Sequence, residues 1–211
     1  MTAAGLALRL AVFAKAPLPG YAKTRLIPLL GAEGAARLAG TLIARTLALA
    51  EAVRPQALTL WCAPSAGHPY FRALAAGQSP PRLCTQTGAD FGARMHAAFT
   101  DELARGPTLL IGTDCPALTA GHLHAAAEAL LGTVAGPAAD AVFLPAEDGG
   151  YVLVGLRTPQ PRLFEDLPWS TPALMDATRA RLRQTGLRGA EPATLWDLDR
   201  PADYRRWLKE G

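Results

Sequence analysis

The sequence predicts an α/β fold in which helices cover both faces of a mainly parallel sheet. Short apolar runs of strand length alternate with longer segments whose apolar residues recur every three or four positions. This alternation favours parallel pairing, because each crossover helix returns the chain to the end of the sheet at which the previous strand began. With 211 residues, of which 50% are hydrophobic, the chain can bury one substantial core. Since neither a repeat nor a low-complexity linker divides it, we expect one domain over residues 1–211.

The first half of the chain reads as three pairs of a strand and a helix. An apolar run predicts the first strand. Leu38, Leu42 and Leu49 then lie at the spacing of one buried helical face, and Pro55 ends the helix that they predict. Two weaker apolar runs supply the other strands. The expected strands are 6–13, 58–62 and 82–85, and the expected helices are 32–53, 68–76 and 93–105.

The second half continues this alternation and then changes character. A strongly apolar run predicts a buried strand, and Thr119 can cap the alanine-rich helix behind it. Two further strands flank an acidic turn, a proline-rich loop follows them, and Asp199 is the expected cap of a last helix. The expected strands are 108–111, 141–144, 151–156 and 194–198, and the expected helices are 120–131 and 172–185.

Composition narrows the class of protein. The formal net charge is +3 and long runs of lysine or arginine are absent from the sequence, so we expect no nucleic-acid partner. Cys62, Cys84 and Cys115 are odd in number and widely spaced, which predicts neither a disulfide framework nor a zinc site. Residues 1–10 lack the features of a cleaved signal, and no uncharged apolar stretch reaches membrane-spanning length. We therefore expect an unprocessed, soluble, cytoplasmic protein without a membrane span.

The loop after the first strand concentrates positive charge. It carries Lys15, Lys23 and Arg25, with no acidic residue between them, and Gly20 lies in its stiff proline-containing part. Loops at this place in α/β proteins bind phosphates, and ammonium and guanidinium groups neutralise them. We predict that these four residues bind the phosphates of a nucleotide or phosphorylated substrate. The alternative is a basic turn that is simply solvated. The loop is not a P-loop, because the glycine pattern of that motif is missing.

Two acidic turns follow later strands. Asp114 lies directly after the strand at 108–111, where ligands of open α/β sheets collect, and Glu147, Asp148, Gly149 and Gly150 join the next two strands. Carboxylates at such strand ends can hold Mg²⁺ or Mn²⁺, which neutralises phosphate charge that the basic loop leaves over. The alternatives are an aspartate that caps a turn and a simple hairpin with an Asp-Gly turn.

Weaker signals place further residues near a substrate. Gln86 offers an amide for the edge of a base, and Arg94 can bind phosphate or form a structural pair. Trp169, Ser170 and Thr171 can line an acceptor pocket with an aromatic wall and hydroxyls, although core anchoring explains them equally well. Glu147, Gly149 and Gly150 of the acidic turn are expected at the same pocket.

Three other groups have a structural explanation. Asp197 and Asp199 fit a helix N-cap, with a metal or catalytic role as the alternative. Cys115 has no adjacent histidine or lysine to activate its thiol, so we predict that it is packed. The four histidines are predicted to be non-catalytic, since two of them on one helix at a spacing of two point to different faces.

Three segments together identify a resemblance. FAKAPLPGYAKTRL at 13–26, GTDCPAL at 112–118 and PAEDGGYVLVGL at 145–156 resemble a bacterial glycosyltransferase-like family of the nucleotide-diphospho-sugar transferase superfamily, some members of which are named arsenosugar biosynthesis glycosyltransferases. The resemblance covers nearly the whole chain and implies a GT-A fold, a Rossmann-like three-layer sandwich that binds an activated nucleotide, usually with a divalent metal.

The basic loop is also similar to that of phospholactate guanylyltransferase and, more distantly, of molybdenum-cofactor guanylyltransferase. In those enzymes an equivalent loop holds a triphosphate, and an aspartate after a central strand holds Mg²⁺. That resemblance implies phosphate binding by Lys15, Lys23 and Arg25 and metal binding by Asp114. The sequence departs from the pattern at 89–92 and at Pro172, which affects the acceptor side more than nucleotide binding.

We therefore predict a metal-dependent transferase with a nucleotide or nucleotide-sugar donor and a small-molecule acceptor. A nucleoside diphosphate sugar is the expected donor, with Lys23 and Asp148 as catalytic residues and Asp114 and Asp148 as metal ligands. The alternatives are nucleotidyl transfer, in which an NTP is joined to a phosphorylated small molecule and pyrophosphate leaves, and a nucleotide-binding regulator without catalysis. Either Glu147 or Asp148 can act as the general base that activates the acceptor. The nucleobase and sugar of the donor, the acceptor and the oligomeric state do not follow from the sequence.

Overall fold

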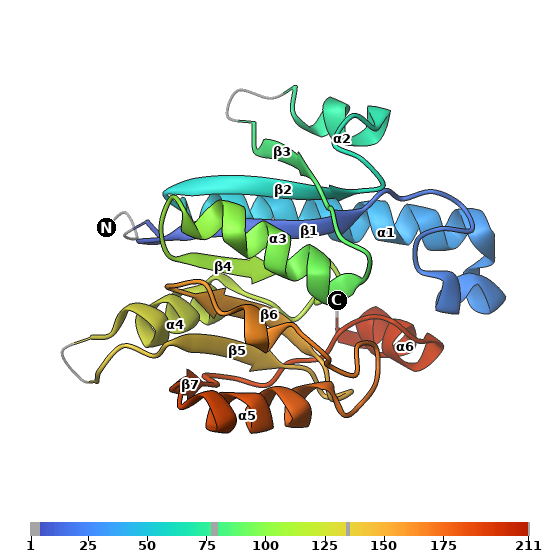
Figure 1. Cartoon of the computed structure of the whole chain (residues 1–211). Coiled ribbons are helices and arrows are strands. Elements are labelled where there is room, and N and C mark those ends of the chain that lie inside the picture. Colours follow the sequence, from blue (N-terminus) through green and yellow to red (C-terminus); the bar gives the residue numbers. More distant parts are fainter. Residues whose placement is uncertain (1–4, 77–79, 134–135, 211) are drawn as a thin grey trace.

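One seven-stranded sheet organises the computed structural model, which describes residues 5–76, 80–133 and 136–210 (Figure 1). Its strands lie in the order β3-β2-β1-β4-β6-β5-β7. The strands are β1 Arg9–Lys15, β2 Ala57–Ala63, β3 Arg82–Thr85, β4 Thr108–Ile111, β5 Ala141–Pro145, β6 Tyr151–Leu156 and β7 Gly189–Ala190. The helices are α1 Ile27–Ala52, α2 Pro69–Leu74, α3 Phe91–Leu103, α4 Ala120–Leu131, α5 Leu174–Thr185 and α6 Pro201–Glu210, with 3-10 turns at Thr24–Leu26 and Pro161–Leu163.

Most strand pairs in the sheet are parallel, as predicted. β1 lies at the centre of the parallel part and pairs with β2 and β4, while β3 extends this part beyond β2. β6 is antiparallel to both β4 and β5, because only the short turn at 146–150 joins it to β5. β7 adds a parallel edge beside β5. The carboxyl ends of the parallel strands therefore share one side of the sheet, the right-hand side in Figure 1.

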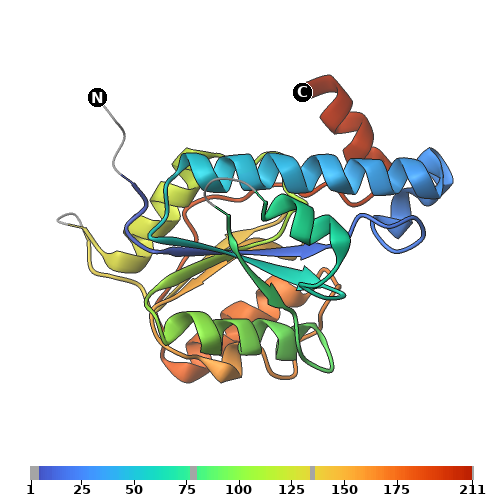
Figure 2. The ribbon, with the colours of Figure 1, turned by 90° about the horizontal axis from the view of Figure 1, so that it is seen from above.

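Helices cover both faces of the sheet, which confirms the predicted three-layer sandwich (Figure 2). Leu10 and Val12 of β1 point to the face covered by α1 and α4, where they belong to one core cluster. Ala11 and Phe13 alternate to the opposite face, which α3 and α5 cover in a second cluster. Both faces of the central strands are thus buried, and this explains why they appear in the sequence as continuous apolar runs.

Several predicted elements have different bounds in the structure. The first strand begins and ends later than 6–13, so Lys15 is its last residue. α1 begins before 32, with non-helical angles at Gly31 (φ 70°, ψ 166°), and α5 begins at Leu174 rather than at 172. The strand expected at 194–198 is wrong: in it only Leu195 forms an isolated bridge, with Ala146, and the edge strand beside β5 is the short β7.

The expected cap of the last helix is also wrong. The backbone N–H groups of Asp199 and Arg200 donate to the carboxylate of Asp203, at 3.1 and 2.6 Å, so Asp203 satisfies the start of α6. The side chain of Asp199 points instead toward two cations of the basic loop. Asp199 has the local position of a helix cap, but the partners of its carboxylate, Lys23 and Arg25, lie far away in the sequence.

Among the described residues, one helical stretch, Thr24–Ala52, is long and apolar enough to cross a membrane, with a mean hydropathy of 1.3. Core helices pass the same test. Ile43, Leu47 and Ala50 of this stretch are buried against the sheet, and Leu38 and Leu42 pack with Trp196 and Leu198. The packing of α1 in the core thus explains its apolar composition.

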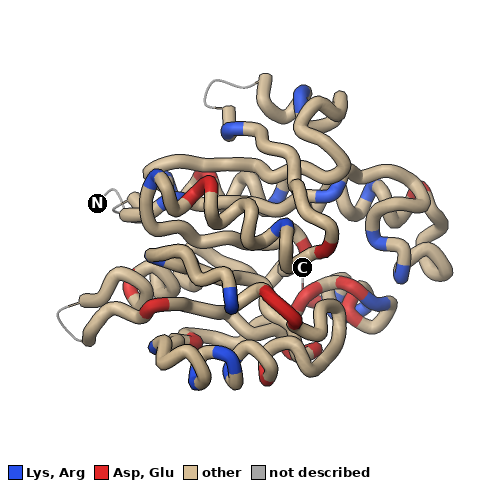
Figure 3. The backbone as a smooth tube through the Cα atoms, in the orientation of Figure 1, with Lys and Arg blue, Asp and Glu red and all other residues tan. Residues whose placement is uncertain are grey.

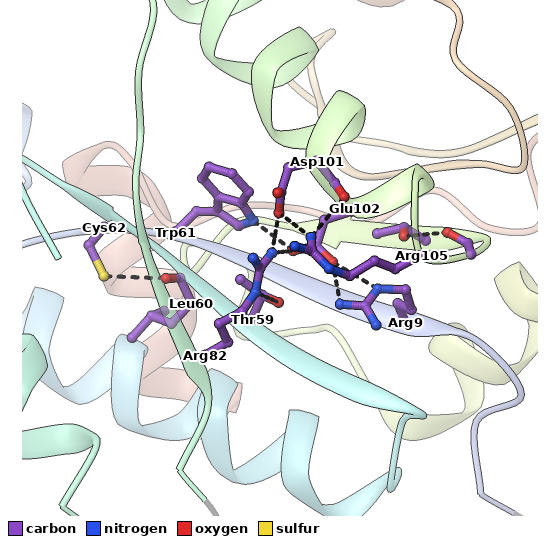
Figure 4. Close-up of polar contacts among 11 residues, drawn as sticks. Arg9, Thr59, Leu60, Trp61, Cys62, Arg82, Asp101, Glu102 and Arg105 are labelled. Carbon is purple, nitrogen blue, oxygen red and sulfur yellow. Dashed lines mark hydrogen bonds and ion pairs between the residues drawn. The ribbon is translucent and has the colours of Figure 1, made fainter.

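A charge network joins α3 to β1, β2 and β3 (Figure 4). The Glu102 carboxylate, only 1% exposed, accepts hydrogen bonds from Arg9 at 2.9 Å, Arg82 at 2.8 Å and the Trp61 indole at 3.2 Å. Arg82 also pairs with Asp101. Burial raises the pKa of Glu102, but hydrogen bonds from its neighbours outweigh it and lower the pKa below the usual range. The network therefore holds an ionised carboxylate inside the protein.

Candidate functional site

Two adjoining hollows lie at the carboxyl ends of the parallel strands. The basic hollow, of about 460 Å³, is lined among others by Lys15, Lys23, Arg25, Arg94, Asp114 and Asp199. The apolar hollow, of about 160 Å³, is lined among others by Phe13, Phe91, Met95, Leu110, Tyr151 and Asp197. Both hollows have Phe13, Phe91, Gly112 and Asp114 in their walls, so a ligand in one can reach a ligand in the other.

Lys23 is the innermost cation of the basic loop. Its backbone adopts the left-handed conformation (φ 50°, ψ 41°) just before the 3-10 turn, and its side chain is only 4% exposed. The ammonium donates to the carbonyl oxygen of Leu198 and lies 2.8 Å from the Asp114 carboxylate and 3.8 Å from that of Asp199. The strained backbone and three partners place this charge at the floor of the hollow.

The other two cations of the loop are more exposed. The ammonium of Lys15 lies 4.4 Å from the ring centroid of Tyr21, a cation–π contact. Arg25, whose side chain is 53% exposed, pairs with Asp199. The expectation of a basic loop without nearby acids therefore holds only for the local sequence, because folding brings Asp114 and Asp199 to it.

The segment before α6 crosses the ends of two strands and carries Asp197 and Asp199 into the site. Leu195 donates its N–H to the carbonyl of Pro145 at 2.9 Å, and Leu198 donates to that of Asp114 at 2.7 Å. Asp197 and Asp199 are thereby placed beside the loops that follow β4 and β5. Around α6 and these loops acidic and basic positions lie together along the backbone (Figure 3).

Four carboxylates interact electrostatically here. Burial raises the pKa of Asp197 from its ordinary 3.8 to about 6, and the negative charges of Asp148, Asp199 and Asp114 add to the effect. Such a crowd of acids favours a bound cation, and carboxylate oxygens are the ligands that Mg²⁺ and Mn²⁺ prefer. In the described part of the chain, however, no three potential ligands already converge as a metal site.

The turn between β5 and β6 is a hairpin turn. The N–H of Gly150 donates to the Asp148 carboxylate at 2.9 Å, and Gly149 (φ 91°) is required because a Cβ there would lie 2.0 Å from the carbonyl oxygen of Pro172. Glu147 forms an ion pair with Arg206 of α6 at 2.8 Å and lines neither hollow. Asp148 also lines neither hollow, but its negative charge contributes to the raised pKa of Asp197.

Three of the weaker sequence candidates line the basic hollow, and the other two line neither hollow. Gln86 and Arg94 line the basic hollow, where the Gln86 amide donates to the carbonyl oxygens of Ala14 and Trp61, at 3.2 and 2.9 Å. Ser170 lines the same hollow, whereas the Thr171 hydroxyl donates to the carbonyl of Pro168. Trp169 lines neither hollow and packs edge-on against Phe91, at 5.1 Å between ring centroids. Cys115 is buried, which raises the pKa of its thiol to about 12, in keeping with a packed residue.

The family follows from comparison of the sequence. Residues 46–171 match the family described as an uncharacterized protein conserved in bacteria, DUF2064. The chain belongs to the DUF2064 family. A search of curated proteins found no match to this DUF2064 chain.

Solved structures resemble the whole DUF2064 chain. A protein from Desulfovibrio desulfuricans G20, provisionally described as a nucleotide-diphospho-sugar transferase, has 25% identity and a TM-score of 0.85, covering 96% of this chain and 86% of that one. Rv0371c from Mycobacterium tuberculosis H37Rv (17% identity, TM-score 0.60, coverage 96% and 98%) and the inositol-1-phosphate CTP transferase from T. maritima (12%, 0.59, 98% and 95%) share the fold. The predicted nucleotide-diphospho-sugar transferase fold is confirmed.

The sequence favours a helix cap for the acids before α6, whereas the structure places Asp197 and Asp199 in the walls of the two hollows. The sequence also assigned no role to Phe91 and Met95, although the structure places both in the wall of the apolar hollow. The signal that was available is the pair of aspartates directly after an apolar run, the same pattern that singled out Asp114. In this DUF2064 protein that run is a cross-connection rather than a strand.

The raised pKa of Asp197 predicts a pH dependence of stability in metal-free protein. An acid whose pKa is higher in the folded than in the unfolded state stabilises the fold below its unfolded pKa, and this contribution disappears as the pH rises through its folded pKa. The free energy of unfolding of the wild type should therefore fall between pH 4 and pH 6 relative to that of Asp197→Asn, by up to about 3 kcal/mol.

Urea unfolding in EDTA at several pH values measures this difference. Asp176→Asn is the matched control, because the Asp176 side chain is 82% exposed on α5 and the pH dependence of that variant should follow the wild type. A constant difference between Asp197→Asn and the wild type from pH 4 to pH 7 would contradict the crowding of acids at Asp197.

Proposed function

We propose that this protein is a metal-dependent transferase whose donor is a nucleoside diphosphate sugar. The observation that carries this proposal is the basic hollow, in which four cations and two carboxylates meet at the carboxyl ends of the parallel strands. Ammonium and guanidinium groups match the oxygens of a diphosphate, and carboxylates match a cation that bridges to it. The volume of about 460 Å³ lies within the roughly 300–1,000 Å³ of small-molecule sites.

Each residue has a role in this proposal. Lys15, Lys23 and Arg25 neutralise the diphosphate, with Lys23 closest to the leaving group. Asp114 and Asp148 would hold Mg²⁺ or Mn²⁺, which when bound supplies a Lewis acid for the departing diphosphate. Support for the metal comes from the carboxylates that crowd Asp197. A neighbour of the same fold, Rv0371c, is described in complex with manganese.

Nucleotidyl transfer is the second candidate. Its specific support is the fold, shared with the T. maritima CTP transferase, together with a hollow whose four cations suit a triphosphate as well as a diphosphate. The released product separates the two: pyrophosphate indicates nucleotidyl transfer, and a nucleoside diphosphate indicates glycosyl transfer.

We also propose a cytoplasmic location, because all three cysteines are free, as in a reducing compartment.

Ligand-induced stabilisation tests the nucleotide site. A panel of nucleotides and nucleotide sugars, with Mg²⁺, with Mn²⁺ or with EDTA, should raise the melting temperature in a metal-dependent way, since a ligand at one hundred times its dissociation constant stabilises by about 2.7 kcal/mol. Arg94→Ala should weaken this stabilisation. Lys209→Ala removes a cation of α6 that does not line the basic hollow and should leave it unchanged.

The outcomes distinguish the proposed transferase from a nucleotide-binding regulator. Metal-dependent binding followed by release of a diphosphate from a nucleotide sugar supports the proposal. Binding without turnover of any donor would point to the nucleotide-binding regulator. If folded protein shows no metal-dependent stabilisation with any nucleotide, the proposed function is wrong.

A further inference from the structure

We propose that the apolar hollow is the acceptor site, and that the acceptor is a small, uncharged hydroxyl compound about the size of one six-membered ring. This inference rests on the proposed function, because the acceptor receives its group from a donor in the basic hollow. It differs from the acceptor pocket that the sequence predicts at Glu147, Gly149, Gly150 and residues 169–171.

The position of the apolar hollow fits an acceptor. Asp114 lies in the walls of both hollows, so molecules bound in the two meet at this carboxylate. Gly112 also lies in both walls, and apart from its own chain neighbours no atom of the described residues lies within 4 Å of the position that a Cβ would occupy there. The loop after β4 thus borders both hollows.

The size and walls of the hollow define the ligand. Its volume of about 160 Å³ is close to the roughly 150 Å³ of an apolar cavity that binds benzene. Phe91, in the first turn of α3, leaves 44% of its surface exposed, and its ring stands edge-on to that of Phe13 at 6.1 Å. A ring of the ligand that packs on Phe91, beside buried Met95 and Leu110, removes this apolar surface from water and so stabilises the complex.

Charge in the hollow selects against anions. The described residues of its wall include the carboxylates of Asp114 and Asp197 and no lysine or arginine, whereas the basic hollow has four such cations. Because the Lys23 ammonium neutralises Asp114, the repulsion comes from Asp197: a carboxylate or phosphate on the acceptor would be repelled there, while a hydroxyl can donate a hydrogen bond to the Asp197 carboxylate.

The transfer step balances with these groups. A bond forms between the acceptor oxygen and the anomeric carbon as the bond from that carbon to the diphosphate oxygen breaks. The diphosphate leaves with the electron pair, and the hydroxyl proton passes to the carboxylate that accepts its hydrogen bond. This arrangement favours glycosyl transfer over nucleotidyl transfer to a phosphorylated acceptor, since such an acceptor would bring a phosphate into an acidic hollow.

Binding of two matched probes tests the inference without turnover. 4-Hydroxybenzyl alcohol and 4-hydroxybenzoate differ mainly in charge, and their affinities for the full chain can be measured by ligand-observed NMR at pH 7.5. We expect the alcohol to bind at least tenfold more tightly than the carboxylate. Asp197→Asn should narrow this ratio at least threefold, an effect that partial unfolding cannot produce because it would weaken both probes alike.

A wall variant locates the probe. Phe91→Ala should weaken binding of the alcohol at least fivefold and leave the charge ratio unchanged. Leu208→Ala, which removes a side chain 63% exposed on α6, should bind like the wild type. Equal affinities of the two probes, no binding of the alcohol, or an unchanged affinity in Phe91→Ala would overturn the inference.

These results are independent of the nucleotide panel. If nucleotides stabilise the protein and the alcohol fails to bind, the proposed function stands and the acceptor inference is wrong. If the alcohol follows the predicted pattern and every nucleotide fails, the apolar hollow is a site for uncharged ring compounds and the transferase proposal is wrong.

Discussion

Lys23→Ala should reduce consumption of the donor by about 10²- to 10³-fold. A positioned donor to a developing oxyanion contributes about 2.7 to 4 kcal/mol to the transition state, and the Lys23 ammonium is the most buried cation of the basic hollow. In the structure it neutralises Asp114, so its loss also leaves that carboxylate without its cation. The measurement is the rate at which nucleoside diphosphate is released from the donor that the stabilisation panel identifies.

The variant should still fold. Asp114 is 52% exposed and can be solvated, and Asp199 keeps its pair with Arg25, so no buried charge loses its partner. Lys209→Ala, on α6 and outside the hollow, provides the control for the removal of one positive charge. Unchanged release of diphosphate by folded Lys23→Ala would remove this lysine from the mechanism.

Glu102→Gln should destabilise the protein by about 3 to 5 kcal/mol, the usual cost of breaking a buried ion pair from one side. The carboxylate is 1% exposed, and the side chain of its partner Arg9 is only 12% exposed, so the substitution leaves a guanidinium in the interior without its counter-charge. The loss acts on α3 and on three strands at once, because Glu102 joins them (Figure 4). Urea unfolding at pH 7 measures it.

Asp101→Asn is the matched control for this prediction. Asp101 is the neighbouring residue and also pairs with Arg82, but its side chain is 35% exposed. Exposed pairs contribute about 0 to 1 kcal/mol, so this variant should lose far less stability than Glu102→Gln. Similar losses in the two variants would show that burial of the Glu102 charge does not decide the effect.

Elements with strong local signals were predicted to the residue. The strands Thr108–Ile111 and Tyr151–Leu156 have the expected bounds. So does the helix Ala120–Leu131, because Thr119 caps it with its side chain and Gly132 follows it. In each case the controlling interactions lie within a few residues, and apolar periodicity together with capping residues encodes them directly.

The acids of the site could not be placed in the same way. Asp199 has the local appearance of a helix cap, yet its carboxylate pairs with Arg25, 174 residues away in the chain. Glu147 and Asp148 are adjacent in sequence, but one pairs with Arg206 on α6 and the other acts on Asp197. Such differences depend on which distant segment crosses the strand ends, and no local pattern records that.

Apolar periodicity, capping residues and loop chemistry are enough to predict the alternating elements, the three-layer sandwich and the place of the basic loop at the end of β1. These signals act over a few neighbouring residues. Three features are visible only in the folded chain: the acids that meet Lys23, the sharing of Asp114 by two hollows, and the apolar and acidic wall beside the basic hollow. The reason is that these contacts join the loops after β1 and β4 to the segment before α6, and the sheet brings those parts of the chain together only after the whole chain has folded.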